Sequence, residues 1–312
     1  MSDRKKYFDL IQRGEKKPTP SGTLTFIGLR LADIPLQHAL LSRSAAAPAS
    51  SFGVRILSSL GLPTIFTHTS TSLPSSLLLP INSLLSASPP GSASPAPDWS
   101  LLGCMTPLTN LPLTSLLLLL MSVGSAAKQI YWKVALSEDS FPASAAVAVS
   151  IYNTVVNSAN ALLFLALGTT SLLSRPLVSF RSPASSSASP SSVPLSTVVG
   201  TLLYVVGMGI ETISERQRAE FKSRAENKGK VCKEGLWRWA RHVNYLGYTL
   251  WRGGYCMVGS GWMGGILMGL WQGWDLSQRA VAVQDEYCSG RYGEQWVQFK
   301  YEVPYRIIPG VY

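Results

Sequence analysis

The sequence predicts an all-α integral membrane protein, built as a bundle of about four to six transmembrane helices. Charged residues make up 14% of its 312 residues, whereas a soluble domain carries about 25%. The charges are also segregated. Between residues 52 and 127 the formal charges are Arg55 and Asp98, whereas almost every second residue of 211–241 is charged. Finally, several uncharged apolar runs approach the roughly 20 residues that cross a bilayer as a helix.

The first hundred residues give the weakest structural signals. Residues 1–20 have no apolar run after their charges, which predicts a cytosolic tail and not a cleavable signal peptide. Residues 23–41 predict a weak span or an interfacial helix, because Arg30 and Asp33 interrupt the apolar run. Beyond it, Ser/Ala/Pro-rich linkers flank an apolar segment in which prolines argue against a regular helix. The linkers are 42–50 and 86–98, and the prolines are Pro63, Pro74 and Pro80.

The rest of the chain contains clearer spans. Transmembrane helices are predicted at 109–127, 144–169 and 195–213, with a polar linker at 181–194. The second span carries three amides that should face other helices in lipid, namely Asn153, Asn157 and Asn160. A Gly- and Trp-rich stretch at 246–274 predicts one long span or a tight hairpin. These boundaries predict three regions: 1–100, 101–194 and 195–312.

The net charge of +10 does not indicate a nucleic-acid partner. The basic residues cluster beside apolar runs, as the positive-inside rule predicts, so the bilayer is the expected partner and the loop 215–243 is placed in the cytosol. Neither a zinc nor a redox site is expected, because no two cysteines have CxxC spacing. The cysteines are Cys104, Cys232, Cys256 and Cys288.

Two neighbouring segments in the C-terminal region concentrate polar side chains. Glu211, Glu215, Arg218 and Lys222 recur at i, i+4, i+7 and i+11, and therefore share one helix face. That face could close over a charged ligand or could be a solvated, salt-bridged helix end. The next segment, GLWRWARHVNYLG, interleaves cations and amides with aromatic rings, which suits either an interfacial belt or a phosphate-bearing cofactor. Its polar residues are Arg238, Arg241, His242 and Asn244, and its rings are Trp237, Trp239 and Tyr245.

These segments resemble a known enzyme group. GLWRWARHVNYLG is similar to the GLWRxSRHPNYxGE signature of the steroid 5-alpha-reductase C-terminal domain and to the RHxNYxGD region of membrane sterol reductases. ETISERQRAEFK resembles the helix that precedes this signature, and the ending VPYRIIPGVY resembles the sterol-reductase terminus. The three blocks occur in the family's order and cover roughly residues 205–312.

The resemblance implies a helical membrane enzyme whose C-terminal half binds NADPH. It would transfer hydride to a carbon–carbon double bond of a steroid-like or other lipid, in the endoplasmic reticulum with its cofactor loop in the cytosol. Matched position by position, the implied cofactor-binding residues are Glu211, Glu215, Lys222, Arg238, Arg241, His242, Asn244, Tyr245, Arg279, Arg291, Tyr292 and Arg306. Tyr305, Pro309 and Tyr312 would anchor the terminus by packing.

The chain departs from the family pattern at two positions and leaves the catalytic acid unidentified. Val243 stands where the family has proline, and Tyr248 stands where it has a carboxylate. Reduction of a polarised double bond also needs a proton donor. The candidates by residue type are Tyr131, Glu138, Asp139 and Tyr152.

Two other functions remain open. A methyltransferase of the isoprenylcysteine or phospholipid type shares an RHPxYxG block and would bind S-adenosylmethionine, although Val243 breaks its His-Pro pair. A family member that has lost catalysis is the other. The run GSGWMG at 259–264 formally matches a dinucleotide fingerprint, but no strand pattern precedes it. Its glycines are interpreted as helix-packing residues.

Overall fold

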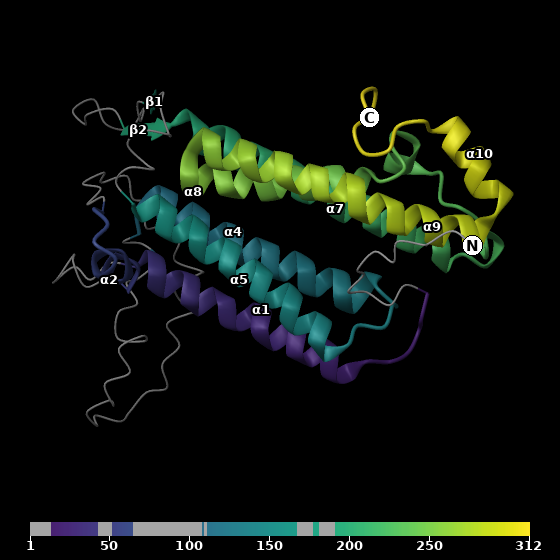
Figure 1. The fold of residues 1–312 in the computed structure, drawn as a ribbon, viewed down its shortest axis with the longest axis horizontal. Coiled ribbons are helices and arrows are strands. Elements are labelled where there is room, and N and C mark those ends of the chain that lie inside the picture. The colour runs from purple at the N-terminus through teal and green to yellow at the C-terminus, as the bar shows by residue number, and fades with distance from the viewer. Residues whose placement is uncertain (1–13, 43–51, 65–107, 109–110, 167–176, 181–190) are drawn as a thin grey trace, which may run out of the picture.

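The computed structural model describes residues 14–42, 52–64, 108, 111–166, 177–180 and 191–312, and these form a helical bundle (Figure 1). In chain order the elements are α1 (Pro20–Leu41), α2 (Phe52–Ser59), α4 (Leu113–Tyr131), the π-helix η3 (Trp132–Leu136), α5 (Ala143–Leu165), β1 (Leu177–Phe180), β2 (Ser191–Pro194), α7 (Leu195–Ser223), the 3₁₀-helices η4 (Ala225–Asn227) and η5 (Gly235–Arg238), α8 (Val243–Asp275), the π-helix η6 (Leu276–Ala280), α9 (Val281–Tyr292) and α10 (Glu294–Glu302).

The protein is an all-α integral membrane protein, as predicted. Among the described residues, three helical stretches are long and apolar enough to cross a membrane: Leu113–Leu136, Ala143–Leu165 and Leu195–Ser223. In Figure 1, α1 runs beside α4 and α5, and α8 runs beside α7. Residues 191–194, predicted as the end of a polar linker, instead form the strand β2, which pairs antiparallel with β1. Residues 43–50 of the first predicted linker, the whole linker 86–98 and Cys104 lie outside the described residues.

Glycines let α7 and α8 pack with their backbones in contact. A Cβ placed on Gly200 would lie 2.7 Å from the carbonyl oxygen of Gly254, and a Cβ on Gly254 would lie 2.5 Å from that of Gly200. Further along α7, a Cβ on Gly207 would lie 2.4 Å from the backbone nitrogen of Trp251. Real Cβ atoms do not approach so closely, so these positions accept glycine only. Small residues at helix interfaces are the usual means of close packing in membranes.

The stretch predicted as one span or a tight hairpin is a hairpin. α8 breaks at Ser260 and Gly261, and Gly261 has φ 69° and ψ −165°. The two arms then pack antiparallel, since a Cβ on Gly265 would lie 2.5 Å from the Cβ of Met257, and one on Gly273 would lie 3.6 Å from Thr249. Gly261 therefore makes the turn, because a positive φ favours glycine. This corrects the interpretation of all GSGWMG glycines as helix-packing residues.

The weak span at 23–41 is a full helix with its charges turned inward. Arg30 and Asp33 are 0% and 2% exposed, and their side chains form an ion pair with an N–O distance of 3.2 Å. Asn157 donates to the same carboxylate oxygen that pairs with Arg30, Asp33 Oδ2, at 2.7 Å. Gln37 donates to Asp33 Oδ1 at 3.0 Å. The polar residues that weakened the sequence signal thus join α1 to α5, and the three asparagines of α5 are buried as predicted.

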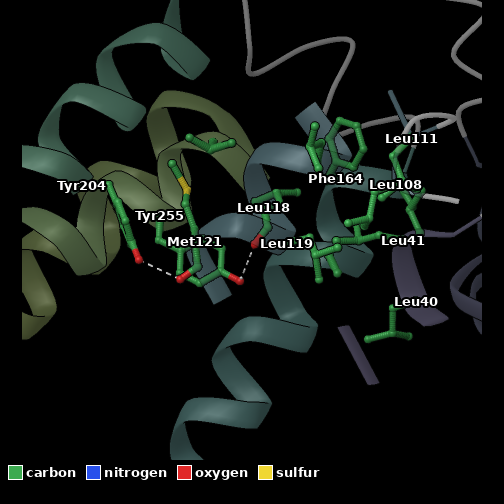
Figure 2. Packing of buried hydrophobic residues seen from close by; sticks show 14 of the residues in the cluster. Leu40, Leu41, Leu108, Leu111, Leu118, Leu119, Met121, Phe164, Tyr204 and Tyr255 are labelled. Carbon is green, nitrogen blue, oxygen red and sulfur yellow. Dashed lines mark hydrogen bonds between the residues drawn. The ribbon is translucent and has the colours of Figure 1, made fainter. Parts of the chain in front are cut away.

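An apolar cluster at the other end of the bundle joins both halves (Figure 2). Leucines of α1 and α4 pack there with Phe164, and two buried phenols reach α4 from α7 and α8. Tyr204 donates to the backbone oxygen of Met121 at 2.7 Å, and Tyr255 donates to that of Leu118 at 3.2 Å. Because each phenol satisfies an oxygen of the facing helix, the cluster fixes the α7–α8 pair against α4.

Candidate functional site

A cavity of about 630 Å³ opens between the two halves of the bundle beside the C-terminal segment. Its size lies within the range of 300–1,000 Å³ that is typical of ligand pockets. Its walls come from α1, α4, α5, α7, α8 and the segments η5, η6, α9 and α10. Nine residues implied by the family resemblance line it: Glu211, Glu215, Lys222, Arg241, His242, Asn244, Tyr245, Arg279 and Tyr292.

Three implied residues do not line the cavity. Arg238 is exposed on η5. Arg291 donates to the hydroxyl of Tyr287 at 3.0 Å and lies over its ring. Arg306 donates to the hydroxyl of Tyr312 at 3.0 Å. The last contact ties down the chain end, which agrees with the anchoring role expected of Tyr312.

The polar face of α7 changes character along its length. Glu211 pairs with Lys128 and accepts a hydrogen bond from Trp251 Nε1 at 2.6 Å. Glu215 pairs with Arg218 and accepts a hydrogen bond from Asn244 at 2.8 Å. The acidic residues are therefore engaged within the protein, and the face turns basic beyond them.

Lys222 lies at the basic end of this face without a close partner. It makes no hydrogen bond or ion pair with any described residue. Arg218 and Arg291 add positive charge around it, and Asp139 opposes them at longer range. An ammonium group in the wall of a cavity, between two other cations, is a favourable place for an anionic ligand.

The signature segment docks the C-terminal segment onto the bundle. The backbone N–H groups of Arg241 and His242 donate to the carbonyl oxygens of Tyr305 and Arg306, at 3.0 and 2.8 Å. Arg241 Nη1 donates to the carbonyl oxygens of Val303 at 2.6 Å and Pro304 at 3.0 Å. Burial lowers the pKa of Arg241, with the charge of Asp285 acting in the opposite direction. The Nη1 group of Arg241 therefore holds the C-terminal segment in place.

Asn244 presents an unused acceptor. Its amide nitrogen is engaged by Glu215, but its Oδ1 atom is buried and has no hydrogen-bond partner among the described residues. Beside it, the rings of His242 and Tyr245 stack with centroids 5.2 Å apart and an angle of 9°. Burial raises the pKa of the nearby Tyr292, so its phenol stays protonated and able to donate. These groups suit a ligand that has both an amide and a flat ring.

The membrane-side end of the cavity contains groups that the sequence did not single out together. Tyr152 and Tyr248 line it with Gln129, Asn153 and Gln272. Tyr152 donates to Gln272 at 3.0 Å. Arg252 lies behind this wall, with hydrogen bonds to Asn153 and Tyr248. Sequence reasoning missed Arg252, although a charged residue inside an apolar span is a recognised signal of function.

Of the four proton-donor candidates, Tyr152 is the one that lines the cavity. The side chain of Tyr131 is 40% exposed, Glu138 pairs with Lys16, and Asp139 accepts a hydrogen bond from the backbone of Gly14. The position of Tyr248, where the family has a carboxylate, lies beside Tyr152 at the same end of the cavity. The departure from the family pattern thus places a phenol where the family has a carboxylate.

Comparison with known proteins gives two kinds of similarity. A family of proteins of unknown function, DUF1295, matches residues 148–272, from α5 to α8. A probable O-methyltransferase, ustE of Ustilaginoidea virens, is 28% identical over 285 residues, which are 91% of this chain and 84% of that protein.

The second kind of similarity is confined to part of the chain. A Delta(14)-sterol reductase of Neurospora crassa is 28% identical over 36% of this chain and 32% of its own length. A 7-dehydrocholesterol reductase of Danio rerio is 30% identical over 28% of this chain and 18% of its own length. The alignments thus span a third or less of these reductases. The chain resembles the sterol reductases over about a third of its length.

Proposed function

We propose that this chain is an NADPH-dependent reductase of a carbon–carbon double bond in a lipid substrate. The observation that carries the proposal is one continuous cavity with two chemically different ends. Cations of α7 and η6 lie at the outer end, and two phenols among apolar side chains lie at the membrane-side end. A charged, water-borne cofactor and an apolar substrate could therefore meet inside it.

The outer end fits NADPH by its donor set. Lys222 supplies positive charge for phosphate oxygens, and Arg218 and Arg279, which pair with Glu215 and Asp275, add guanidinium donors. The unpartnered Oδ1 of Asn244 suits the amide nitrogen of the nicotinamide carboxamide. Bound there, the nicotinamide would supply the hydride. This assigns cofactor binding to residues 195–312, as the sequence boundaries suggest.

The membrane-side end fits the substrate and the proton. Phe26, Val149 and Trp271 give it an apolar lining that suits a lipid body. The hydroxyl of Tyr248 accepts a hydrogen bond from Arg252 at 3.4 Å and lies beside the hydroxyl of Tyr152, so the two phenols form one proton-bearing pair in the cavity wall. We assign proton donation to the Tyr152–Tyr248 pair. The cofactor side would face the cytosol, with the protein in the endoplasmic reticulum.

O-methyl transfer is the second candidate, because the similarity to the Ustilaginoidea virens protein extends over most of both chains. In that case S-adenosylmethionine would occupy the outer end. The cationic wall favours NADPH over this cofactor, since S-adenosylmethionine carries a sulfonium cation and no phosphate.

Thermal unfolding of the detergent-purified protein separates these functions. NADPH is expected to raise the unfolding temperature, Tm, and S-adenosylmethionine to leave it unchanged. Asn244→Ala is expected to weaken NADPH binding about tenfold, because it removes one hydrogen-bonding group worth about 1.4 kcal/mol. Gln278→Ala is the matched control, since Gln278 is exposed and does not line the cavity.

Each alternative result has one interpretation. Protection by S-adenosylmethionine alone would establish the methyltransferase. Protection by neither cofactor would leave a non-catalytic protein. An equal effect of Asn244→Ala and Gln278→Ala on the NADPH shift would remove Asn244 from the cofactor site.

A further inference from the structure

We infer that the membrane-side end of the cavity binds an acidic oxygen of the substrate, a carboxylate, phenolate or enolate, with Arg252 as its counter-ion. The inference rests on the proposed function in taking this cavity as the substrate site, and it specifies the substrate class. A neutral sterol or hydrocarbon would not neutralise the charge of Arg252.

Arg252 is a fully buried charge with unused donors. It is 0% exposed on the first arm of the α8 hairpin. Its Nη2 donates to Asn153 and, at 3.4 Å, to Tyr248. Its Nε and Nη1 have no acceptor among the described residues. Aromatic faces compensate it in part, since its guanidinium lies 4.3 Å from the ring centroid of Trp251.

Two other charges buried inside the helical bundle, those of Arg30 and Lys128, each have a carboxylate partner. Arg30, equally buried, has Asp33 at 3.2 Å. Lys128 has Glu211 as its ion-pair partner. No ion pair joins Arg252 to a carboxylate in the part of the chain that the structure describes, and its charge also repels Arg30. Burial of a charge is costly unless it is paired, so an anion bound beside Arg252 would be stabilised.

Such an anion can reach Arg252 through the cavity wall. Tyr248 and Asn153 both contact Arg252 and both line the cavity. The Tyr248 hydroxyl accepts from Arg252 and lies beside the hydroxyl of Tyr152, so its proton can turn from Tyr152 to an oxygen inside the cavity. An oxyanion there would gain this hydrogen bond and the attraction of the guanidinium one side chain away. The family's carboxylate at position 248 would repel such a group, whereas tyrosine accommodates it.

Two matched arginine variants test whether the charge lacks a protein partner. Arg252→Met is expected to keep or raise the Tm of the ligand-free protein, because Asn153 Oδ1 retains its bond from Gln129. Arg30→Met is expected to lower the Tm on the order of 10 °C, because Asp33 loses its counter-charge. The inference would be overturned if Arg252→Met lowered the Tm as much as Arg30→Met does, or if the Arg252→Met protein did not fold.

Ligand pairs that differ in one acidic group test the substrate class without any cofactor. The probes are hexadecanoate against hexadecan-1-ol, and cholesteryl hemisuccinate against cholesterol. At least one acid is expected to raise the wild-type Tm about 5 °C more than its neutral partner at a hundredfold excess over its Kd. Arg252→Met is expected to abolish this difference, and Tyr248→Phe, which keeps the ring, to reduce it.

The outcomes separate this inference from the proposed function. If neither acid surpasses its neutral partner, or if Arg252→Met responds as the wild type does, the anion site is wrong even where NADPH protects the protein. If the acids raise the Tm and NADPH does not, the anion site is supported and the proposed reductase function is wrong.

Discussion

Replacing Arg241 with methionine is expected to abolish protection by NADPH and to release the C-terminal segment. Its Nη1 donates to two carbonyl oxygens of that segment, at 2.6 and 3.0 Å, and it is 7% exposed. Loss of these charge-assisted bonds leaves buried acceptors unsatisfied, at a cost of about 3–5 kcal/mol. Hydrogen exchange at residues 303–312 should accelerate, and the NADPH-induced rise in Tm should disappear.

Arg238→Met is the matched control for this prediction. Arg238 belongs to the same signature segment but is exposed and does not line the cavity. Its replacement should change stability by less than about 0.5 kcal/mol and leave the NADPH effect intact. Equal losses in the two variants would show that the segment binds by its overall charge and not by docking of the terminus.

Gly207→Leu is expected to yield little folded protein. A Cβ at position 207 would already lie 2.4 Å from the backbone nitrogen of Trp251 and 2.6 Å from the carbonyl oxygen of Gly247. A leucine there must push α7 away from α8, which separates Glu211 from Trp251 and opens the cavity wall. Overpacking costs about 1–3 kcal/mol in ordinary cores and more where backbones touch. The fraction of monodisperse protein in size-exclusion chromatography measures the effect.

Gly209→Leu provides the control on the same helix. A Cβ on Gly209 meets no atom within 4 Å. Leucine also has a higher helix propensity than glycine, by roughly 0.5–1 kcal/mol. The variant should therefore express and unfold like the wild type. A loss of folded protein equal to that of Gly207→Leu would mean that bulk anywhere on α7 is harmful and that the glycine contact is not the cause.

The anchoring of α7 to the signature segment shows why three sequence blocks act as one site. Trp237 Nε1 donates to the carbonyl oxygen of Ser214 at 2.8 Å, and Leu236 N–H donates to Gln217 Oε1 at 2.9 Å. Together with the docked terminus, these bonds enclose the cavity on its outer side. The family resemblance identified the three sequence blocks within residues 205–312 and their order. It did not distinguish the arginines that line the cavity from those that do not.

Local patterns in the sequence determined the membrane class, the helical segments and the polar face of α7. Hydropathy and helical periodicity depend on residues close together in the chain, so they can be read directly. The predicted spans at 144–169 and 195–213 overlap α5 and α7. Beyond its apolar part, α7 continues to Ser223 and is hydrogen-bonded to η5.

Only the tertiary structure decided how the polar residues are paired. Arg30 and Arg252 both interrupt apolar runs, but Arg30 meets Asp33 on its own helix, whereas Arg252 meets phenols and an amide. The turn at Gly261 and the use of Arg241 as a clamp likewise depend on segments far apart in the chain. The physical reason is that the energy of a buried charge or a close backbone contact depends on its partner, and folding brings that partner from elsewhere in the chain.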